Sequence, residues 1–168
     1  MGAPAAADQG KALLDLYDRA LPQVYGYLVA RCGSVATAED LTGEVFLAAV
    51  SAVQRDAVDE MTMAWLVGVA RNKLVDHWRK REREDRSLAV VHDDPVVDDD
   101  WDAELELTEA HAVLAGLGGH HRSALTLRYL DGLSVPEVAH HLGRTVHATE
   151  ALLVRARLAF RKAYRGYA

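Results

Sequence analysis

Apolar residues recur at steps of three and four along most of the chain, which is the spacing of one face of an α-helix. Pro22 interrupts the first run and is expected to kink its helix or divide it into two. The apolar positions of that run, between Lys11 and Arg31, are 13, 17, 20, 24 and 28. A second run opens at Thr37 and has the apolar face Leu41, Val45, Ala48, Ala49 and Ala52. The period lapses between residues 54 and 63, where a loop is predicted.

The strongest helical pattern in the first half runs from Thr62 to Arg83. Its apolar face comprises Leu66, Val69, Ala70, Leu74 and Trp78. The opposite face carries Asn72, Asp76, Arg79 and Arg83. A helix with one core face and one basic, hydrogen-bonding face can lie along a phosphate backbone, although a charged face is more often merely solvated.

A pair of helices with a glycine between them is predicted near the carboxyl end. Ser134 and Glu137 have the Ser-x-x-Glu spacing of a capping box, and Gly143 suits the left-handed residue that ends a helix. Thr145 is a candidate N-cap for the second helix, whose apolar positions are Val146, Thr149, Leu153, Ala156 and Phe160. Two helices joined by such a turn form a helix-turn-helix, which inserts its second helix into a DNA major groove. Two adjacent helices of an ordinary bundle are the alternative.

The remaining segments complete an all-α prediction of two small helical domains. Further helices are expected over 102–115 and 120–130, and no strand-like alternation is present. Residues 87–101 have no period and many aspartates, which is typical of an extended, self-repelling linker. The predicted organisation is a flexible tail (1–10), a first domain (11–86), the linker and a second domain (102–168).

The net charge of −6 hides a strong segregation of charge along the chain. Residues 71–83 carry +4 and residues 120–168 carry +5, whereas residues 93–109 carry −9. Two basic blocks around an acidic bridge suggest binding partners for each block.

Catalytic, metal and cofactor chemistry finds no support in the sequence. The single cysteine, Cys32, excludes an intramolecular disulfide. The histidine pairs 120–121 and 140–141 are poor ligand sets, because neighbours on a helix point about 100° apart. No phosphate-binding loop, nucleophile elbow or zinc motif is present. We also find no signal peptide and no apolar run long enough for a membrane span. We therefore expect a cytoplasmic, non-enzymatic protein without cofactor, metal or membrane insertion.

Four segments carry a resemblance to a known family. They are AEDLTGEVF (38–46), AWLVGVARNKLVDHWRKR (64–81), LTLRYLDGLSVPEVAHHLG (125–143) and TVHATEALLVRAR (145–157). In this order, around an acidic linker, they resemble the extracytoplasmic-function sigma factors of bacteria. These are small two-domain subunits that direct RNA polymerase to promoters, where they enable DNA melting and transcription initiation.

The resemblance implies three binding surfaces. The core polymerase contact would involve Asp40, Glu44 and Phe46. The −10 promoter element, melted by flipping a base into a pocket of the 54–63 loop, would meet Arg71, Asn72, Lys73, Asp76, Arg79, Lys80 and Arg83. The −35 element would meet Arg144, Thr145, His147, Ala148, Glu150, Ala151, Val154, Arg155 and Arg157. An anti-sigma factor is a further implied partner, and the linker would follow the path of the product RNA.

Two departures from the family pattern bear on specificity. The family commonly has Lys or Arg, Ser and Arg where this chain has Glu150, Ala151 and Leu152. Glu can accept from cytosine N4 and Ala can contact a thymine methyl, so base readout without the usual basic contact is one interpretation. The other is that Glu150 only faces solvent and that His147, Ala151 and DNA shape give specificity. The 54–63 loop is also unusually acidic, which predicts an unusual or weak −10 contact.

Two other functions remain open at this point. One is an autonomous helix-turn-helix regulator, which would bind duplex DNA by itself as a dimer. The other is a protein-interaction module of the sigma family that has lost its DNA contact at Glu150.

Overall fold

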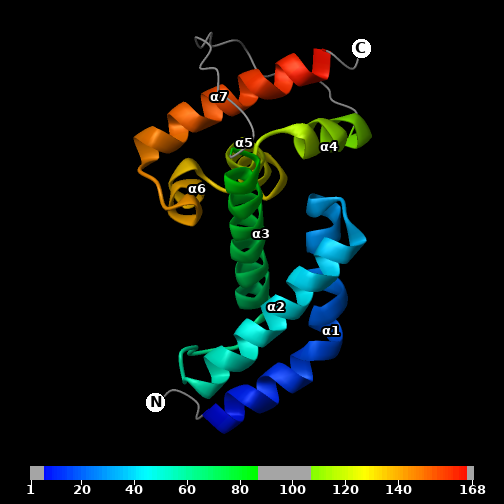
Figure 1. Cartoon of the computed structure of the whole chain (residues 1–168). Coiled ribbons are helices and arrows are strands. Elements are labelled where there is room, and N and C mark those ends of the chain that lie inside the picture. Colours follow the sequence, from blue (N-terminus) through cyan, green and yellow to red (C-terminus); the bar gives the residue numbers. More distant parts are fainter. Residues whose placement is uncertain (1–5, 87–106, 166–168) are drawn as a thin grey trace. The chain divides into compact units, whose positions relative to one another are not determined.

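The computed structural model describes residues 6–86 and 107–165, and every regular element in these ranges is helical (Figure 1). This confirms the all-α class. The elements are α1 (Ala6–Cys32), α2 (Val35–Gln54), α3 (Met63–Arg86), α4 (Leu107–Gly116), α5 (Gly119–Leu125), a π-helix η1 (Thr126–Leu130), α6 (Val135–Leu142) and α7 (Val146–Arg165). None of these helices is long and apolar enough to cross a membrane. The predicted linker, 87–101, lies outside the described residues.

The chain forms two compact units, Met1–Leu74 and Val75–Ala168, and the boundary between them falls within α3. The first half of α3 therefore completes the first unit, and its second half contributes Val75 and Trp78 to the second. Sequence periodicity could not detect this division, because the apolar stripe runs from Leu66 to Trp78 without a break at the boundary.

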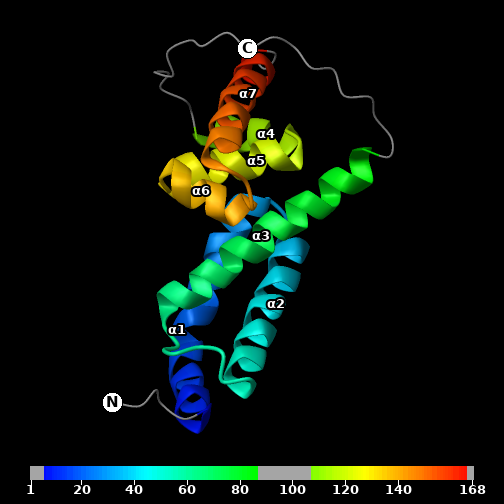
Figure 2. The ribbon, with the colours of Figure 1, turned by 90° about the vertical axis from the view of Figure 1, so that its left-hand side faces the viewer.

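The first unit is built around the antiparallel pair α1 and α2, which lie side by side in both views (Figures 1 and 2). The chain reverses at Gly33, whose φ of 67° suits a residue without a Cβ. The buried apolar positions of α1 and α2 include Leu13, Leu16, Ala20, Val24, Leu28, Ala38, Leu41, Val45, Ala49, Ala52 and Val53. Their spacing at three and four residues places one apolar stripe of each helix in the core.

Four details of the first unit differ from the prediction. Pro22 is exposed and lies inside one helix, so it does not divide α1 in two. Tyr17, predicted as a core position, is 42% exposed. The N-cap of α2 is Ser34 rather than Thr37, because the Ser34 side chain accepts from the Thr37 backbone N–H at 3.3 Å. Residues 6–10, predicted to belong to a tail, form the first turns of α1.

The second unit packs α4, α5 and α6 against α7. One buried cluster joins Val75 of α3 to Ala124, Leu127, Val138, Leu142, Leu152 and Leu153. A second cluster comprises Val113, Leu114, Leu125, Ala156 and Phe160. Gly119 packs closely against α3, since a Cβ there would overlap the Trp78 carbonyl oxygen.

Candidate nucleic-acid and protein interfaces

Local hydrogen bonds position the predicted recognition helix. The Ser134 hydroxyl accepts from the Glu137 N–H at 3.4 Å, and the Glu137 carboxylate accepts from the Ser134 N–H at 2.7 Å. Gly143 ends α6 with a φ of 61°, and the Thr145 hydroxyl then caps α7 by accepting from the Ala148 N–H at 3.1 Å. The capping box, the glycine stop and the second cap are all confirmed as predicted. The two helices form a helix-turn-helix.

The outer face of α7 carries much of the predicted −35 set. Thr149, Leu152, Leu153, Ala156 and Phe160 are buried, so the opposite face is turned outward. That face exposes His147, Glu150, Ala151 and Arg155, while Ala148 and Val154 are half-buried beside them. Arg144 is half-buried and Thr145 is exposed at the start of the helix. Val146, predicted as a core position, is instead 43% exposed.

Two basic residues at the recognition helix, Arg157 within α7 and Arg128 before it, contact other groups of the protein. Arg157 donates to the Tyr129 hydroxyl at 3.3 Å, and the Arg128 guanidinium carbon lies 5.8 Å from the Tyr129 ring centre. Arg128 also donates to the Leu133 carbonyl at 3.0 Å, which fixes the turn before α6. The role of Tyr129 was not predicted from the sequence. The sequence indicated it only through the position of an aromatic residue between Arg128 and the turn that follows. Its hydroxyl and ring orient two guanidinium groups next to the recognition helix.

The predicted −10 residues of α3 fall on three sides of one helix. Asn72, Asp76, Arg79 and Arg83 recur at steps of three and four and so share one side. Lys73 and Lys80 lie seven residues apart on an adjacent side, and Arg71 lies apart from both groups. Arg79 is half-buried, within 4.0 Å of an Asp76 carboxylate oxygen and 3.5 Å of the His141 carbonyl. The separation of 4.0 Å and the 69% exposure of the Asp76 side chain make this a weak ion pair.

Gln9 holds the predicted −10 loop, a role that sequence reasoning missed. Its amide nitrogen donates to the Asp59 carbonyl at 2.6 Å, and its amide oxygen accepts from the Met61 N–H at 3.0 Å. The loop side chains Val58 and Met61 are buried, whereas its acidic side chains face solvent. The sequence did contain an indication of this role, because Gln9 lies on the same helical stripe as the buried Leu13 and Leu16. A polar residue on that stripe needs a partner.

The predicted polymerase residues do not share one surface. Asp40 and Glu44 are exposed and one turn apart on the same side of α2. Phe46 is half-buried and points roughly 160° away from Glu44, as residues two apart on a helix do. It meets Tyr17 of α1 edge to face, with ring centres 5.0 Å apart.

Partly buried polar groups lie around the start of α5, and Arg122 among them is fully buried. The Glu82 carboxylate accepts from the His120 N–H, and the Arg122 guanidinium carbon lies 4.6 Å from the Trp78 ring centre. Burial lowers the pKa of His121 below its usual value; the Glu82 carboxylate opposes this shift and the Arg155 guanidinium adds to it. Among the described residues, no group of three or more His, Cys, Asp or Glu side chains is arranged to hold a metal ion.

Family models match both units. The Sigma-70 region 2 model matches residues 16–84, and the Sigma-70 region 4 model matches residues 107–160. The first match contains the α2 and α3 surfaces, and the second contains the helix-turn-helix.

Individual relatives agree with these matches. The ECF RNA polymerase sigma factor SigC of Mycobacterium tuberculosis is 32% identical over 155 residues, which cover 91% of this chain and 83% of SigC. The ECF RNA polymerase sigma factor BldN of Streptomyces coelicolor is 35% identical over 158 residues. That match covers 90% of this chain and only 60% of BldN, so the chain spans less than two thirds of that relative.

A solved structure has the same fold. The sigma factor RpoE of Bartonella quintana, determined in complex with the anti-sigma factor NepR, aligns with a TM-score of 0.56. The alignment covers 94% of this chain and 97% of the other, at 23% identity. At this level of identity the likeness concerns the fold.

Proposed function

Because the chain belongs to the extracytoplasmic-function (ECF) family of RNA polymerase sigma factors, we propose that its separate surfaces bind core polymerase and the two promoter elements. Members of this family are transcription initiation factors and not enzymes. They bind core polymerase and promoter DNA, and anti-sigma factors hold many of them inactive. The observation that carries the residue-level proposal is the helix-turn-helix, whose capped second helix exposes one continuous face.

The −35 contact is assigned to the exposed face of α7. His147, Glu150 and Ala151 occupy the first two turns, where a recognition helix meets base edges. Glu150 is exposed with no neutralising cation in its own turn, so it can accept a hydrogen bond from cytosine N4. Arg155 and the Tyr129-bound Arg157 lie further along α7 and suit phosphate oxygens.

The −10 contact is assigned to the basic side of α3 together with the loop that Gln9 holds. The loop exposes Arg55, Asp56, Asp59 and Glu60, which is a net negative surface. Phosphates would be repelled there, so the loop suits a flipped base and the α3 cations suit the backbone. In this proposal residues 11–86 and 102–168 are the two promoter-binding regions and residues 87–101 the linker between them, although the compact units divide within α3.

The polymerase contact is assigned to Asp40 and Glu44. Two carboxylates one turn apart on an exposed helix face suit a basic partner surface. Because core polymerase is in the cytoplasm, the proposal also places the protein there.

Run-off transcription with purified core polymerase tests the proposal. The wild-type protein is expected to give a promoter-dependent transcript. Glu150→Arg is expected to change which base is preferred at one −35 position, and Arg155→Ala to weaken all promoters alike. If no promoter supports a transcript while the protein alone shifts duplex DNA as a dimer, the autonomous regulator is the correct function. Asp40→Lys with Glu44→Lys should abolish transcription and leave DNA contacts intact.

A further inference from the structure

An exposed tyrosine outside the helix-turn-helix holds one arginine of the recognition helix. The Arg157 guanidinium donates to the Tyr129 hydroxyl at 3.3 Å, although the two residues are 28 positions apart in the sequence. Tyr129 belongs to η1 and is 43% exposed. We propose that Tyr129 is a positioning residue for promoter DNA, which aligns the Arg157 guanidinium with a phosphate on one strand of the −35 element. The proposal rests on the proposed −35 contact of α7, and it does not require the polymerase contact.

The π-helix η1 gives Tyr129 a fixed backbone. The Asp131 N–H donates to the Thr126 carbonyl at 3.0 Å, five residues back, which is the hydrogen bond of a π-helix. Thr126 is buried in the second unit, whereas Tyr129 lies at the surface. The Arg128 guanidinium carbon is 5.8 Å from the Tyr129 ring centre, which is within the range of a cation–π contact. The tyrosine is therefore held both through its backbone and at its ring, and its hydroxyl can fix a second side chain.

Two arginines flank the base-reading face of α7. Residues two apart on a helix point about 160° apart, so Arg155 and Arg157 lie on opposite flanks of the helix. His147 and Val154 lie between them, near the middle of the outward face. The major groove is about 12 Å wide, and a helix within it has a phosphate backbone on each side. Each arginine therefore faces a different DNA strand.

The two arginines differ in how they are held. Arg155 is exposed, whereas Arg157 is half-buried and bonded to Tyr129. A guanidinium group has further N–H donors beside the one bonded to Tyr129, and these can contact phosphate oxygens. An arginine that is already oriented loses less side-chain entropy when it binds. The bond to Tyr129 thus favours the phosphate contact of Arg157 in particular.

The hydroxyl of an exposed tyrosine adds little to the stability of the fold. Water can replace Arg157 as its hydrogen-bond partner, so removing the hydroxyl costs the folded state little. Tyr129→Phe, which keeps the ring, should therefore leave the thermal unfolding temperature unchanged and weaken DNA binding. A structural role of the hydroxyl would show the opposite pattern.

A neighbouring leucine suggests a different role for Tyr129, which the same variant tests. Leu130 is 38% exposed, and the two side chains together could form a small apolar patch for a protein partner. Such a patch would use the tyrosine ring and not its hydroxyl. Tyr129→Phe would then have no effect, whereas Leu130→Ala would weaken binding of core polymerase.

Binding of duplex DNA by the full-length protein, without polymerase, tests the proposal. A duplex of about 20 base pairs is selected from a random pool by the wild-type protein at low salt, where phosphate contacts contribute most. Affinity is measured by fluorescence anisotropy. Tyr129→Phe is expected to bind about fivefold more weakly and Arg157→Ala about tenfold more weakly, and the double variant no more weakly than Arg157→Ala. Arg155→Ala is the matched control, and its loss should multiply with that of Tyr129→Phe because Arg155 lies on the other flank.

Neutral methylphosphonate groups, introduced at one phosphate at a time, identify the phosphate that Arg157 contacts. For the wild-type protein, neutralising that phosphate should weaken binding. Tyr129→Phe and Arg157→Ala should both become less sensitive at this same position. Arg155→Ala should instead lose sensitivity at a phosphate of the opposite strand. This readout separates positioning of Arg157 from a general weakening of the fold.

Three results would overturn the proposal. The first is wild-type affinity of Tyr129→Phe, and the second is losses of Tyr129→Phe and Arg157→Ala that multiply in the double variant. The third is a methylphosphonate pattern that Tyr129→Phe leaves unchanged. Failure to select any duplex would overturn it together with the −35 assignment of α7. Failure of run-off transcription would refute only the polymerase function, because the duplex assay contains no polymerase.

Discussion

The helix-turn-helix and the predicted −10 loop are the two candidate DNA-binding elements. The hydrogen bonds that hold them join residues at very different separations along the sequence. The two helices of the helix-turn-helix begin at caps between residues three apart in sequence, at Ser134 for α6 and at Thr145 for α7. The −10 loop is positioned by Gln9, which bonds residues 50 and 52 positions away. A local cap forms with its helix, whereas the Gln9 bonds require the first unit to be folded. The comparison suggests that the −10 loop loses its shape first when the first unit is weakened.

The largest effect is expected from Gly119→Ala, which tests long-range packing in the second unit. The added Cβ would overlap the Trp78 carbonyl oxygen, a backbone atom that cannot move aside. We expect a loss of about 3 kcal/mol in the free energy of unfolding, measured by chemical denaturation. Gly116→Ala is the control, because nothing lies within 4 Å of a Cβ there. Equal stability of the two variants would show that α5 does not pack on Trp78 in solution.

Gln9→Ala tests the long-range clamp on the loop. The buried Met61 N–H would lose its acceptor, which costs about 2 kcal/mol. Promoter opening, followed by permanganate reactivity of unpaired thymines, should fall more than binding of duplex promoter DNA. Gln23→Ala, an exposed glutamine on the same helix, should change neither. Normal opening by the Gln9 variant would mean that Val58 and Met61 alone hold the loop.

Ser134→Ala tests how much the local N-cap of α6 contributes to stability. The Glu137 N–H would lose its cap, and we expect a loss of about 1 kcal/mol in thermal unfolding of the second unit. Ser134→Gly is the matched variant and should lose only about 0.3 kcal/mol, since glycine is tolerated as an N-cap. A greater loss for Gly than for Ala would show that the backbone, and not the hydroxyl, fixes the start of α6.

The smallest effect is expected from pH. Burial lowers the pKa of His121, so the folded protein binds fewer protons than the unfolded chain just below the ordinary value of 6.5. His121 is neutral in both states well above pH 6.5, and the free energy of unfolding should fall as the pH drops through that value. Thermal unfolding between pH 7.5 and 5.5 measures the slope. His121→Gln should reduce this slope. An unchanged slope in that variant would assign the pH dependence to other groups.

The sequence predicted the features that depend on residues close together along the chain, such as helix caps and helix ends. Ser134, Glu137, Gly143 and Thr145 each perform the predicted role, because capping uses side chains and backbone groups within one turn. The family motifs also identified the helix-turn-helix and the exposed face of α7. Pro22 was harder to interpret, because a proline on the exposed side of a helix supported by α2 need not end it.

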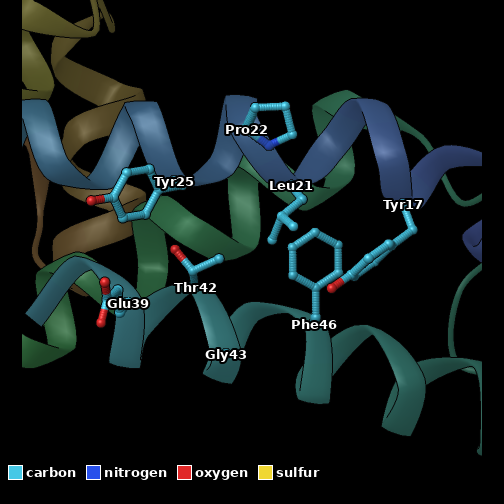
Figure 3. Close-up of a pocket in the computed structure, with 8 residues that line it drawn as sticks. All are labelled: Tyr17, Leu21, Pro22, Tyr25, Glu39, Thr42, Gly43 and Phe46. Atoms are coloured by element: carbon cyan, nitrogen blue, oxygen red, sulfur yellow. The ribbon is translucent and has the colours of Figure 1, made fainter. Parts of the chain in front are cut away.

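Only the tertiary structure could decide what depends on distant residues. Tyr17 fits the helical period of the α1 core, yet its ring meets that of Phe46 beside an open cavity between α1 and α2 (Figure 3). Trp78 fits the period of the first domain, yet it is buried against Arg122 of the second unit. Helical periodicity shows that one face of a helix is apolar, but it does not show which other element packs on that face. The amino-acid sequence thus determined the helices and their caps through local geometry. Tertiary packing decided the hydrogen bonds of Gln9 to the loop, the division of α3 and the cavity between α1 and α2.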